Sequence, residues 1–293
     1  MNSAIRPELA FVGGGNMASA LIGGVLKGGR VPATVLVIEP DDRQRARLAL
    51  QFGVLALPAA DAHLLDVPLV VWAVKPQSFA AAARPCAGFV AGALQLSVMA
   101  GIRTEALTAA TGSQRVVRAM PNTPALVGLG ISGLYATPAV SHADRAAAEA
   151  VLAPSGELMW LQRERDLDAV TALSGSGPAY VYYFIEAMIQ AAGEMGLTVE
   201  QGRRLALATF AGATALAQQS ADSPAVLRER VTSKGGTTYA ALMSLDNDAV
   251  KAAFVRALHA ARGRAHALGD EFGAGTGAAP KPASAAPDPL PRP

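Results

Sequence analysis

Residues 11–18 read FVGGGNMA, and this stretch decides the fold of the first half of the chain. It fits the pattern GxGxxA, with Gly13, Gly15 and Ala18 at the fixed positions. Gly13 permits a tight turn out of a strand, Gly15 lets the backbone approach a phosphate, and Ala18 allows a helix to pack closely. The pattern alone is weak evidence, because a glycine-rich turn in another α/β fold can match it. Here it lies between a strand-like run and a helix-like segment, which favours a dinucleotide-binding turn.

Strand-like runs alternate with helix-length segments from residue 9 to about residue 161. This alternation is typical of a parallel sheet with helices on both faces. The expected strands are 9–12, 35–39, 69–74, 94–99 and 115–120, and the expected helices include 18–27 and 42–52. The sequence therefore predicts an α/β fold whose N-terminal domain, residues 1–162, is a Rossmann-type dinucleotide-binding domain.

Residues 163–270 are predicted to form an all-helical domain, with helices over 178–195, 199–219, 224–231 and 248–268 and another after Gly236. The helix from Pro178 is apolar around most of its circumference, so it must be buried on several sides. A domain of about a hundred residues has few other helices to bury this one, so we expect a partner subunit to supply that burial. Residues 271–293 are rich in Ala, Pro and Gly, and we expect a disordered tail there.

The composition excludes several classes of function. The chain has 293 residues with a formal net charge of +2, which gives no basic footprint for nucleic acid. Its one cysteine, Cys86, permits no internal disulfide, and its four histidines are widely spaced, so no metal site is expected. The apolar stretch 180–192 is too short to cross a membrane. The expected setting is cytoplasmic, with no nucleic-acid or membrane partner.

Candidate cofactor residues follow the ends of several expected strands, where open α/β sheets bind ligands. Glu39 closes the second strand, and a carboxylate there binds the adenosine ribose hydroxyls and repels a 2′-phosphate, which favours NAD. Arg43, Arg45 and Arg47 follow, and one of them could bind that phosphate, so the choice between NADPH and NADH stays open. Lys75 is either a cofactor contact or a surface lysine. The candidates are Gly13, Gly15, Asn16, Met17, Glu39, Ala73, Val74, Lys75, Pro76, Ala100, Asn122 and Thr123.

A second polar turn, VTSKGGTT at residues 231–238, lies far along the chain. Its glycines let the backbone turn sharply, its hydroxyls are hydrogen-bonding groups, and the helix that follows opens with unpaired amides. This combination suits a small carboxylate, and an ordinary loop and cap is the alternative. The turn SGSGP at 174–178 is expected to cap the helix from Pro178, and could also shape the floor of a pocket.

Five motifs, in this order, resemble those of the pyrroline-5-carboxylate reductase family: FVGGGNMA, AVKPQ, RAMPNTP, SGSGPAYVYYFIEAM and VTSKGGTTYAAL. The similarity covers about residues 9–269. The resemblance implies reduction of 1-pyrroline-5-carboxylate, a cyclic imine, to L-proline with NADPH or NADH, the final step of proline biosynthesis. It also implies a helical domain interlocked with that of a second subunit, active sites near the dimer interface, and dimers that often assemble into rings.

By the same resemblance, Thr238 is the catalytic residue, placed near the imine nitrogen. Ser233, Gly236, Thr237 and Thr238 bind the substrate, with the carboxylate held by Ser233 and the backbone amides. The motifs contain no His or acidic general acid, so the imine binds already protonated or receives its proton through a hydroxyl or water.

Two positions depart from the family, and two other functions stay open. Residues 59–60 are alanines where many members have an asparagine for the adenosine ribose, and Arg230 stands where some have asparagine. A related β-hydroxyacid dehydrogenase would use a lysine on a long inter-domain helix as its acid and base, but residues 178–195 contain none. A non-catalytic dinucleotide-binding regulator would not need the intact loop at 231–238.

Overall fold

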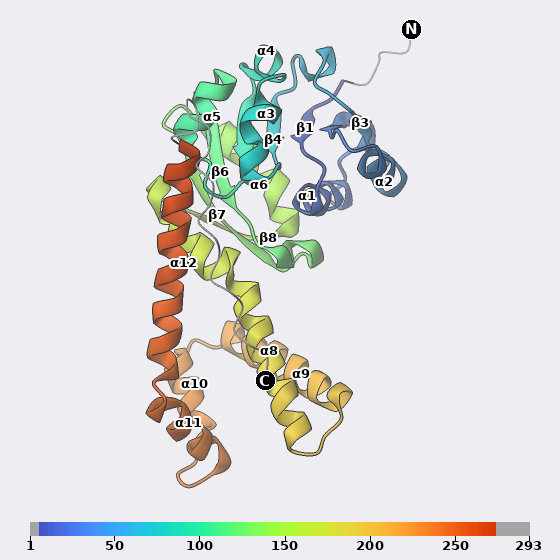
Figure 1. Cartoon of the computed structure of the whole chain (residues 1–293). Coiled ribbons are helices and arrows are strands. Elements are labelled where there is room, and N and C mark those ends of the chain that lie inside the picture. The colour runs from blue at the N-terminus through green and yellow to red at the C-terminus, as the bar shows by residue number, and fades with distance from the viewer. Residues whose placement is uncertain (1–5, 274–293) are drawn as a thin grey trace.

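The computed structural model describes residues 6–273, and it divides them into a sheet region and a helical region (Figure 1). The described strands form one sheet in the order β3-β2-β1-β4-β5-β6-β7-β8. The strands are β1 (Leu9–Val12), β2 (Val35–Ile38), β3 (Leu55–Leu57), β4 (Leu69–Trp72), β5 (Leu94–Ser97), β6 (Val116–Met120), β7 (Gly130–Ala136) and β8 (Gly156–Trp160). The central order, with crossovers on either side of β1, confirms the predicted Rossmann-type sheet.

Both faces of the sheet are covered, because the central strands are apolar on both sides. Leu9 and Phe11 point into one core cluster, and Ala10 and Val12 point into the other. The first cluster is covered by α1 (Asn16–Lys27), α2 (Asp42–Phe52) and α6 (His142–Leu152). The second is covered by α3 (Phe79–Ala83), α4 (Ala87–Val90) and α5 (Thr104–Thr111).

Both edges of the sheet differ from the predicted pattern. The strands β3, β7 and β8 were not predicted, and β7 runs antiparallel to β6. Only a short segment with one 3-10 turn, Thr123–Val127, joins these two strands, which is too short for a parallel crossover. Strand β7 was missed because several of its residues are small. A Cβ on Gly133 would lie 2.8 Å from Val170, so the helix that ends at Val170 packs directly against the backbone of β7 at this glycine.

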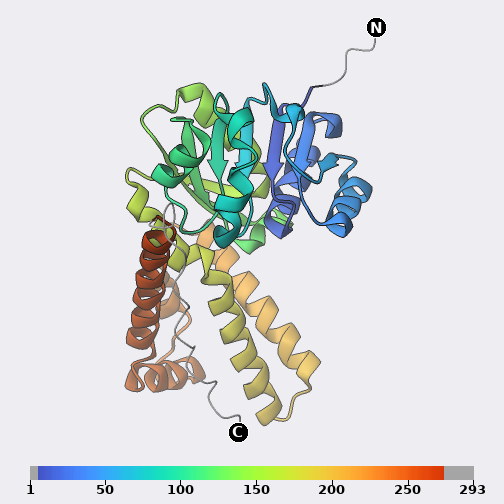
Figure 2. The same cartoon turned by 45° about the horizontal axis from the view of Figure 1, so that its top comes forward.

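The helical region begins with α7 (Leu167–Val170) and a π-helical turn, Thr171–Gly175. The helices that follow are α8 (Gly177–Glu194), α9 (Val199–Gln219), α10 (Pro224–Arg230), α11 (Thr237–Asn247) and α12 (Val250–Gly273). Helices α8 and α9 form an antiparallel pair that projects from the sheet region (Figure 2). All the predicted helices of this region are present, and α12 runs three residues into the predicted tail, whose remainder lies outside the described residues.

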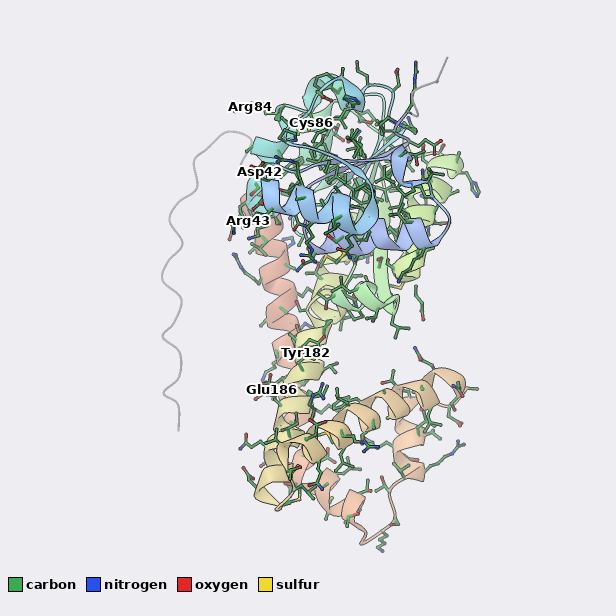
Figure 3. All side chains as sticks on the ribbon, turned by 90° about the vertical axis from the view of Figure 1, so that its right-hand side faces the viewer. Asp42, Arg43, Arg84, Cys86, Tyr182 and Glu186 are labelled. Atoms are coloured by element: carbon green, nitrogen blue, oxygen red, sulfur yellow. The ribbon has the colours of Figure 1, made fainter. Side chains whose placement is uncertain are left out.

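Helix α8 is apolar around its circumference, as predicted, yet within a single chain it is largely exposed. Only Ala192 on this helix is buried, while 69% of Tyr183 is exposed. Tyr182 and Glu186 stand out from the same helix, one turn apart, in Figure 3. A helix of this composition is stable when a second surface covers it.

Helix α12 connects the two ends of the molecule. It packs beside α11 near its start and against α7 and the π-helical turn further along. At its end, Asp270 forms an ion pair with Arg103 at 2.6 Å, and a Cβ on Gly101 would lie 3.1 Å from the Phe272 ring. Because Gly101 and Arg103 belong to the loop after β5, α12 fixes that loop to the helical region.

Candidate functional site

The carboxyl ends of the parallel strands form the first part of the site. In register, Val12 at the end of β1 pairs with Ile38 of β2 and Trp72 of β4, and Trp72 pairs with Ser97 of β5. The topology changes direction between β1 and β4, which is where open α/β sheets bind ligands. The twelve candidate cofactor residues all lie on or just after the ends of β1, β2, β4, β5 and β6.

Gly13 makes the turn out of β1 possible. Its φ is +96°, and a Cβ at this position would lie 2.8 Å from the carbonyl oxygen of Ala73. Its amide donates to Ile38 O at 2.8 Å, and the Ala73 amide donates to Val12 O at 2.9 Å. The glycine turn and the end of β4 are therefore in direct contact, and only glycine fits between them.

Gly15 leaves the start of α1 open. It is the N-cap of this helix, no side chain caps the first amides, and the first turn contains no acidic residue. A Cβ on Gly15 would meet no atom within 4 Å, so the space in front of these amides is clear. Uncapped amides at a helix N-terminus, facing open space, fit a dinucleotide pyrophosphate.

Glu39 follows β2 and holds the glycine turn from the side. Its Oε2 accepts a hydrogen bond from the Gly14 amide at 2.8 Å, and its Oε1 accepts one from the Asp41 amide at 3.0 Å. The side chain of Gln44 donates to the Gly14 carbonyl oxygen. The roles of Gly14 and Gln44 were not predicted from sequence, because a glycine inside the motif and a polar residue on a helix carry no distinguishing pattern.

The remaining candidates at this edge differ in their surroundings. Lys75 is exposed and precedes a 3-10 turn, with no side-chain cap bond there. The side chain of Asn122 accepts a hydrogen bond from the Ile131 amide at 3.0 Å, so it holds the start of β7. Thr123 is exposed, and Ala100 lies half-buried in the loop after β5.

The SGSGP turn does not cap α8, which corrects the prediction. Ser176 makes no side-chain cap bond, and Ser174 Oγ donates instead to the Val170 carbonyl oxygen at 3.0 Å. The segment is a π-helical turn continuous with α7, a feature often found at functional sites. A Cβ on Gly175 would lie 2.6 Å from Met120 Cε, so this turn packs directly on the end of β6.

The loop at 231–238 has the geometry of a small anion site. Gly235 has a φ of +76°, and the Gly236 amide donates to Ser233 O at 3.0 Å. No side chain caps α11, and its first helical bond runs from the Ala240 amide to Gly236 O, which leaves the preceding amides unpaired within the helix. Ser233, Thr237 and Thr238 bring hydroxyls to the same turn.

Within one chain the two halves of the site lie apart. Helix α11, which opens with Thr237 and Thr238, is at the end of the helical region remote from the sheet (Figures 1 and 2). The structure thus gathers the twelve cofactor candidates at one edge and places the substrate candidates elsewhere. Arg230, before this loop, is ion-paired with Asp222.

The described residues carry no other obvious chemistry. Burial raises the pKa of the Cys86 thiol to about 11, so this cysteine is not a nucleophile. Residues 6–273 contain no group of three or more His, Cys, Asp or Glu side chains placed to hold a metal ion. No helix over the same range has the length and apolar character needed to span a membrane.

An apolar surface near the sheet edge also escaped the sequence analysis. Leu126, Val127 and Leu129, in the segment between β6 and β7, are strongly exposed, and 80% of Leu129 is accessible. The sequence signal that could have predicted this surface is the run of apolar residues in the turn between β6 and β7. Isolated exposed leucines are common, but three within four residues suggest contact with another surface.

Comparisons with known proteins agree over about nine-tenths of the chain. Residues 164–268 match the family model for pyrroline-5-carboxylate reductase dimerisation, and residues 8–101 match the model for coenzyme F420-dependent NADP oxidoreductases. The chain is 41% identical to a pyrroline-5-carboxylate reductase of Pseudomonas aeruginosa, over 91% of this chain and 98% of that protein.

Two solved structures are similar over most of the chain. A pyrroline-5-carboxylate reductase from Coxiella burnetii superposes with a TM-score of 0.83 at 32% identity, covering 89% of this chain and 98% of the other. The Plasmodium falciparum pyrroline carboxylate reductase with NADP bound gives 0.81 at 28% identity, covering 91% and 100%.

Proposed function

Because the chain belongs to the pyrroline-5-carboxylate reductase family, we propose that it reduces 1-pyrroline-5-carboxylate to L-proline with NADPH or NADH, the final step of proline biosynthesis. The observation that carries the proposal is that two helices begin without a side-chain cap. Helix α1 follows the glycine turn, and α11 follows the SKGG turn at residues 233–236. One fits a dinucleotide pyrophosphate and the other a small carboxylate. The same division supports a dinucleotide-binding domain over 1–162 and a substrate and dimerisation domain over 163–270.

The dinucleotide would lie across the carboxyl ends of β1 and β4. The uncapped amides at the start of α1, with Gly13, Gly15, Asn16 and Met17, would hold the pyrophosphate. Glu39 would contact the adenosine ribose. The segment from Ala73 to Pro76, Ala100, Asn122 and Thr123 would line the nicotinamide side. The reduced nicotinamide supplies a hydride to the carbon of the C=N bond.

The loop before α11 would hold the substrate. Ser233 and the amides of Thr237 and Thr238 would bind the carboxylate. The predicted contact from the Gly236 amide is not free, because this amide already donates to Ser233 O within the turn. Thr238 would donate a hydrogen bond to the imine nitrogen and relay to it one proton from solvent. The nitrogen gains this proton as the carbon gains the hydride, so the C=N bond becomes the C–N bond of proline. Catalysis is then mainly positioning and desolvation of the imine.

The complete site would require a second copy of the chain, as an interlocked dimer that can assemble further into a ring. Three observations support this: the remoteness of α11 from the sheet edge, the exposure of α8, and the exposed cluster of Leu126, Val127 and Leu129. A partner's helical region lying over this cluster would bring its Thr238 to the cofactor edge and bury the apolar surfaces together. The predicted cytoplasmic location stays a prediction.

Substrate-dependent oxidation of the cofactor tests the activity. The purified protein is mixed with 1-pyrroline-5-carboxylate and either NADH or NADPH, and absorbance of the reduced cofactor is followed. We expect a loss of absorbance that needs both protein and imine, with proline as the product. No oxidation of either cofactor would refute the proposed activity.

Mixing two inactive variants tests the two-chain site. Gly15→Asp should fold, because the new side chain has open space and can cap α1, yet its charge should exclude the pyrophosphate. Thr238→Ala should bind cofactor but turn over about a hundredfold more slowly. Random pairing of equal amounts after co-refolding should restore about one quarter of wild-type activity, since half the pairs are mixed and each has one intact site.

Gly92→Asp is the matched control for the first variant. Gly92 is also exposed and has open space for a Cβ. It precedes β5, so it lies at the amino ends of the strands, away from the carboxyl ends where the cofactor candidates lie. This variant should retain full activity alone. A mixture no more active than its two components would show that each site lies within one chain.

A further inference from the structure

Three carboxylates gather where β2 ends. Glu39 follows the strand directly, Asp41 is the N-cap of α2, and Asp42 is the first residue of that helix. Asp41 Oδ1 accepts hydrogen bonds from the amides of Arg43 at 2.8 Å and Gln44 at 3.0 Å. Figure 3 shows Asp42 and Arg43 side by side at the start of α2. The adenosine end of a dinucleotide on the glycine turn would face this group.

The Glu39 carboxylate has a fixed orientation beside the glycine turn. Its two oxygens each accept one backbone hydrogen bond, from Gly14 at 2.8 Å and from Asp41 at 3.0 Å. Each oxygen keeps a further lone pair for another donor. A ribose with free hydroxyls can donate to these lone pairs, whereas a 2′-phosphate has only charged acceptor oxygens to offer. The bound carboxylate cannot swing away without breaking both backbone bonds.

The neighbouring arginines offset the negative charge of Glu39 only in part. Arg45 donates to the carbonyl oxygens of Glu39 and Pro40, both at 2.8 Å, and is ion-paired with Asp42. Its side chain is only 19% exposed, so its guanidinium is already used inside the protein. Arg43 and Arg47 are exposed, and over residues 6–273 neither has a carboxylate within 4.0 Å. Solvent and salt screen such exposed charges strongly.

We infer that Glu39 is the specificity-determining residue of the dinucleotide site and makes the chain prefer NADH over NADPH. The inference rests on the proposed function, because it assumes that the sheet edge binds a nicotinamide dinucleotide. A fixed negative charge next to the 2′ position disfavours a phosphate dianion there. Removing the charge of Glu39 should therefore improve NADPH binding.

Calorimetric titration of the full chain with NADH and with NADPH, in the absence of imine, tests the inference through binding alone. We expect NADH to bind at least about tenfold more tightly. Glu39→Gln removes the charge and keeps one of the two acceptor oxygens, which can still accept from the Gly14 amide, and it should strengthen NADPH binding by about tenfold.

Glu157→Gln is the control, the same substitution at an exposed position on the edge strand β8. It should leave both affinities unchanged. Equal or tighter binding of NADPH by the wild-type chain would overturn the inference, as would a NADH:NADPH ratio that Glu39→Gln does not change. If both dinucleotides bind equally well and the imine is reduced, only the preference fails. If neither binds, the proposed function fails with it.

Discussion

The Arg118 guanidinium lies 2.7 Å from the Glu164 carboxylate, and this ion pair ties β6 to the segment leading into the helical region. Arg118 is only 6% exposed, and its Nε is buried without a partner among the described residues. Glu164 also accepts hydrogen bonds from the Thr104 amide and hydroxyl, both at 2.7 Å. One carboxylate therefore holds two elements of the sheet region against the start of the helices.

Glu164→Gln should lower the free energy of unfolding by about 2 kcal/mol, because it leaves a buried guanidinium without a counter-charge. Urea unfolding followed by circular dichroism measures the change, at one fixed protein concentration since the chain self-associates. Glu157→Gln, an exposed glutamate, should change the free energy by less than about 0.5 kcal/mol. Equal midpoints for both variants would contradict the prediction.

Stability should fall at acid pH in part through Asp144. A hydrogen bond from Arg115, with further bonds from Ser141, lowers the pKa of this carboxyl to about 2 from its ordinary value of 3.8. Because the folded pKa is depressed, the stabilisation is full above about pH 4 and is lost as the pH falls towards 2. At neutral pH it amounts to about 1 to 2 kcal/mol.

Urea midpoints of wild type and Asp144→Asn at pH 7 and pH 2.5 test this account. The difference between the two proteins should be largest at pH 7 and should fall to about a third of that value at pH 2.5, because the folded pKa lies near 2. The capping box of α6 also includes a bond from the Asp144 amide to Ser141 Oγ, which does not involve the carboxyl and is the same in both proteins at either pH. A difference that is the same at both pH values would assign the effect to packing alone.

Gly13→Ala should destabilise the sheet region and weaken dinucleotide binding together. The positive φ and the 2.8 Å approach to Ala73 O leave no room for a methyl group, so we expect a loss of about 2 kcal/mol. Gly15→Ala should leave the unfolding midpoint unchanged and weaken only the dinucleotide, because its Cβ meets open space. Thermal unfolding and cofactor titration of the two variants separate the effects.

Thr238→Ala should lower kcat by about a hundredfold with little effect on dinucleotide affinity, since the lost hydroxyl serves the imine nitrogen. Thr238→Ser keeps the hydroxyl and should retain most of the activity. Steady-state kinetics and cofactor titration check the two expectations. Loss of dinucleotide binding in the alanine variant would mean that the two halves of the site have been assigned wrongly.

Prediction of the fold from sequence succeeded best where the local backbone conformation allows only one residue type. The turn at Gly13 needs a glycine for its positive φ, and its spacing to Gly15 locates the end of β1 and the start of α1. The helices of the second region could also be predicted, because their segments are long and Pro178 and Pro224 mark two of their starts. The apolar circumference of α8 correctly predicted that one chain could not bury it.

What escaped prediction depends on contacts between distant residues. Strand β7 contains Gly130, Ser132 and Gly133, which carry no strand signal, and its glycine is explained only by the approach of Val170. The pairing of Asn122 with Ile131 and of Glu39 with Gly14 likewise requires the folded chain. Sequence order also gives no indication that the two helix starts of the site lie apart within one copy.

Helix α12 gives this separation a mechanical consequence. Its 24 residues span about 36 Å as one rigid rod. The C-terminal end of α12 contacts the loop after β5, at the carboxyl ends of the strands. Its N-terminal end lies beside α11, the helix that follows the substrate loop. If each site takes its cofactor edge from one copy and its substrate loop from the other, this rod belongs to both sites of a pair. Closure of one site around its cofactor would then pull on the neighbouring site, so the two would work in alternation or in step and not independently.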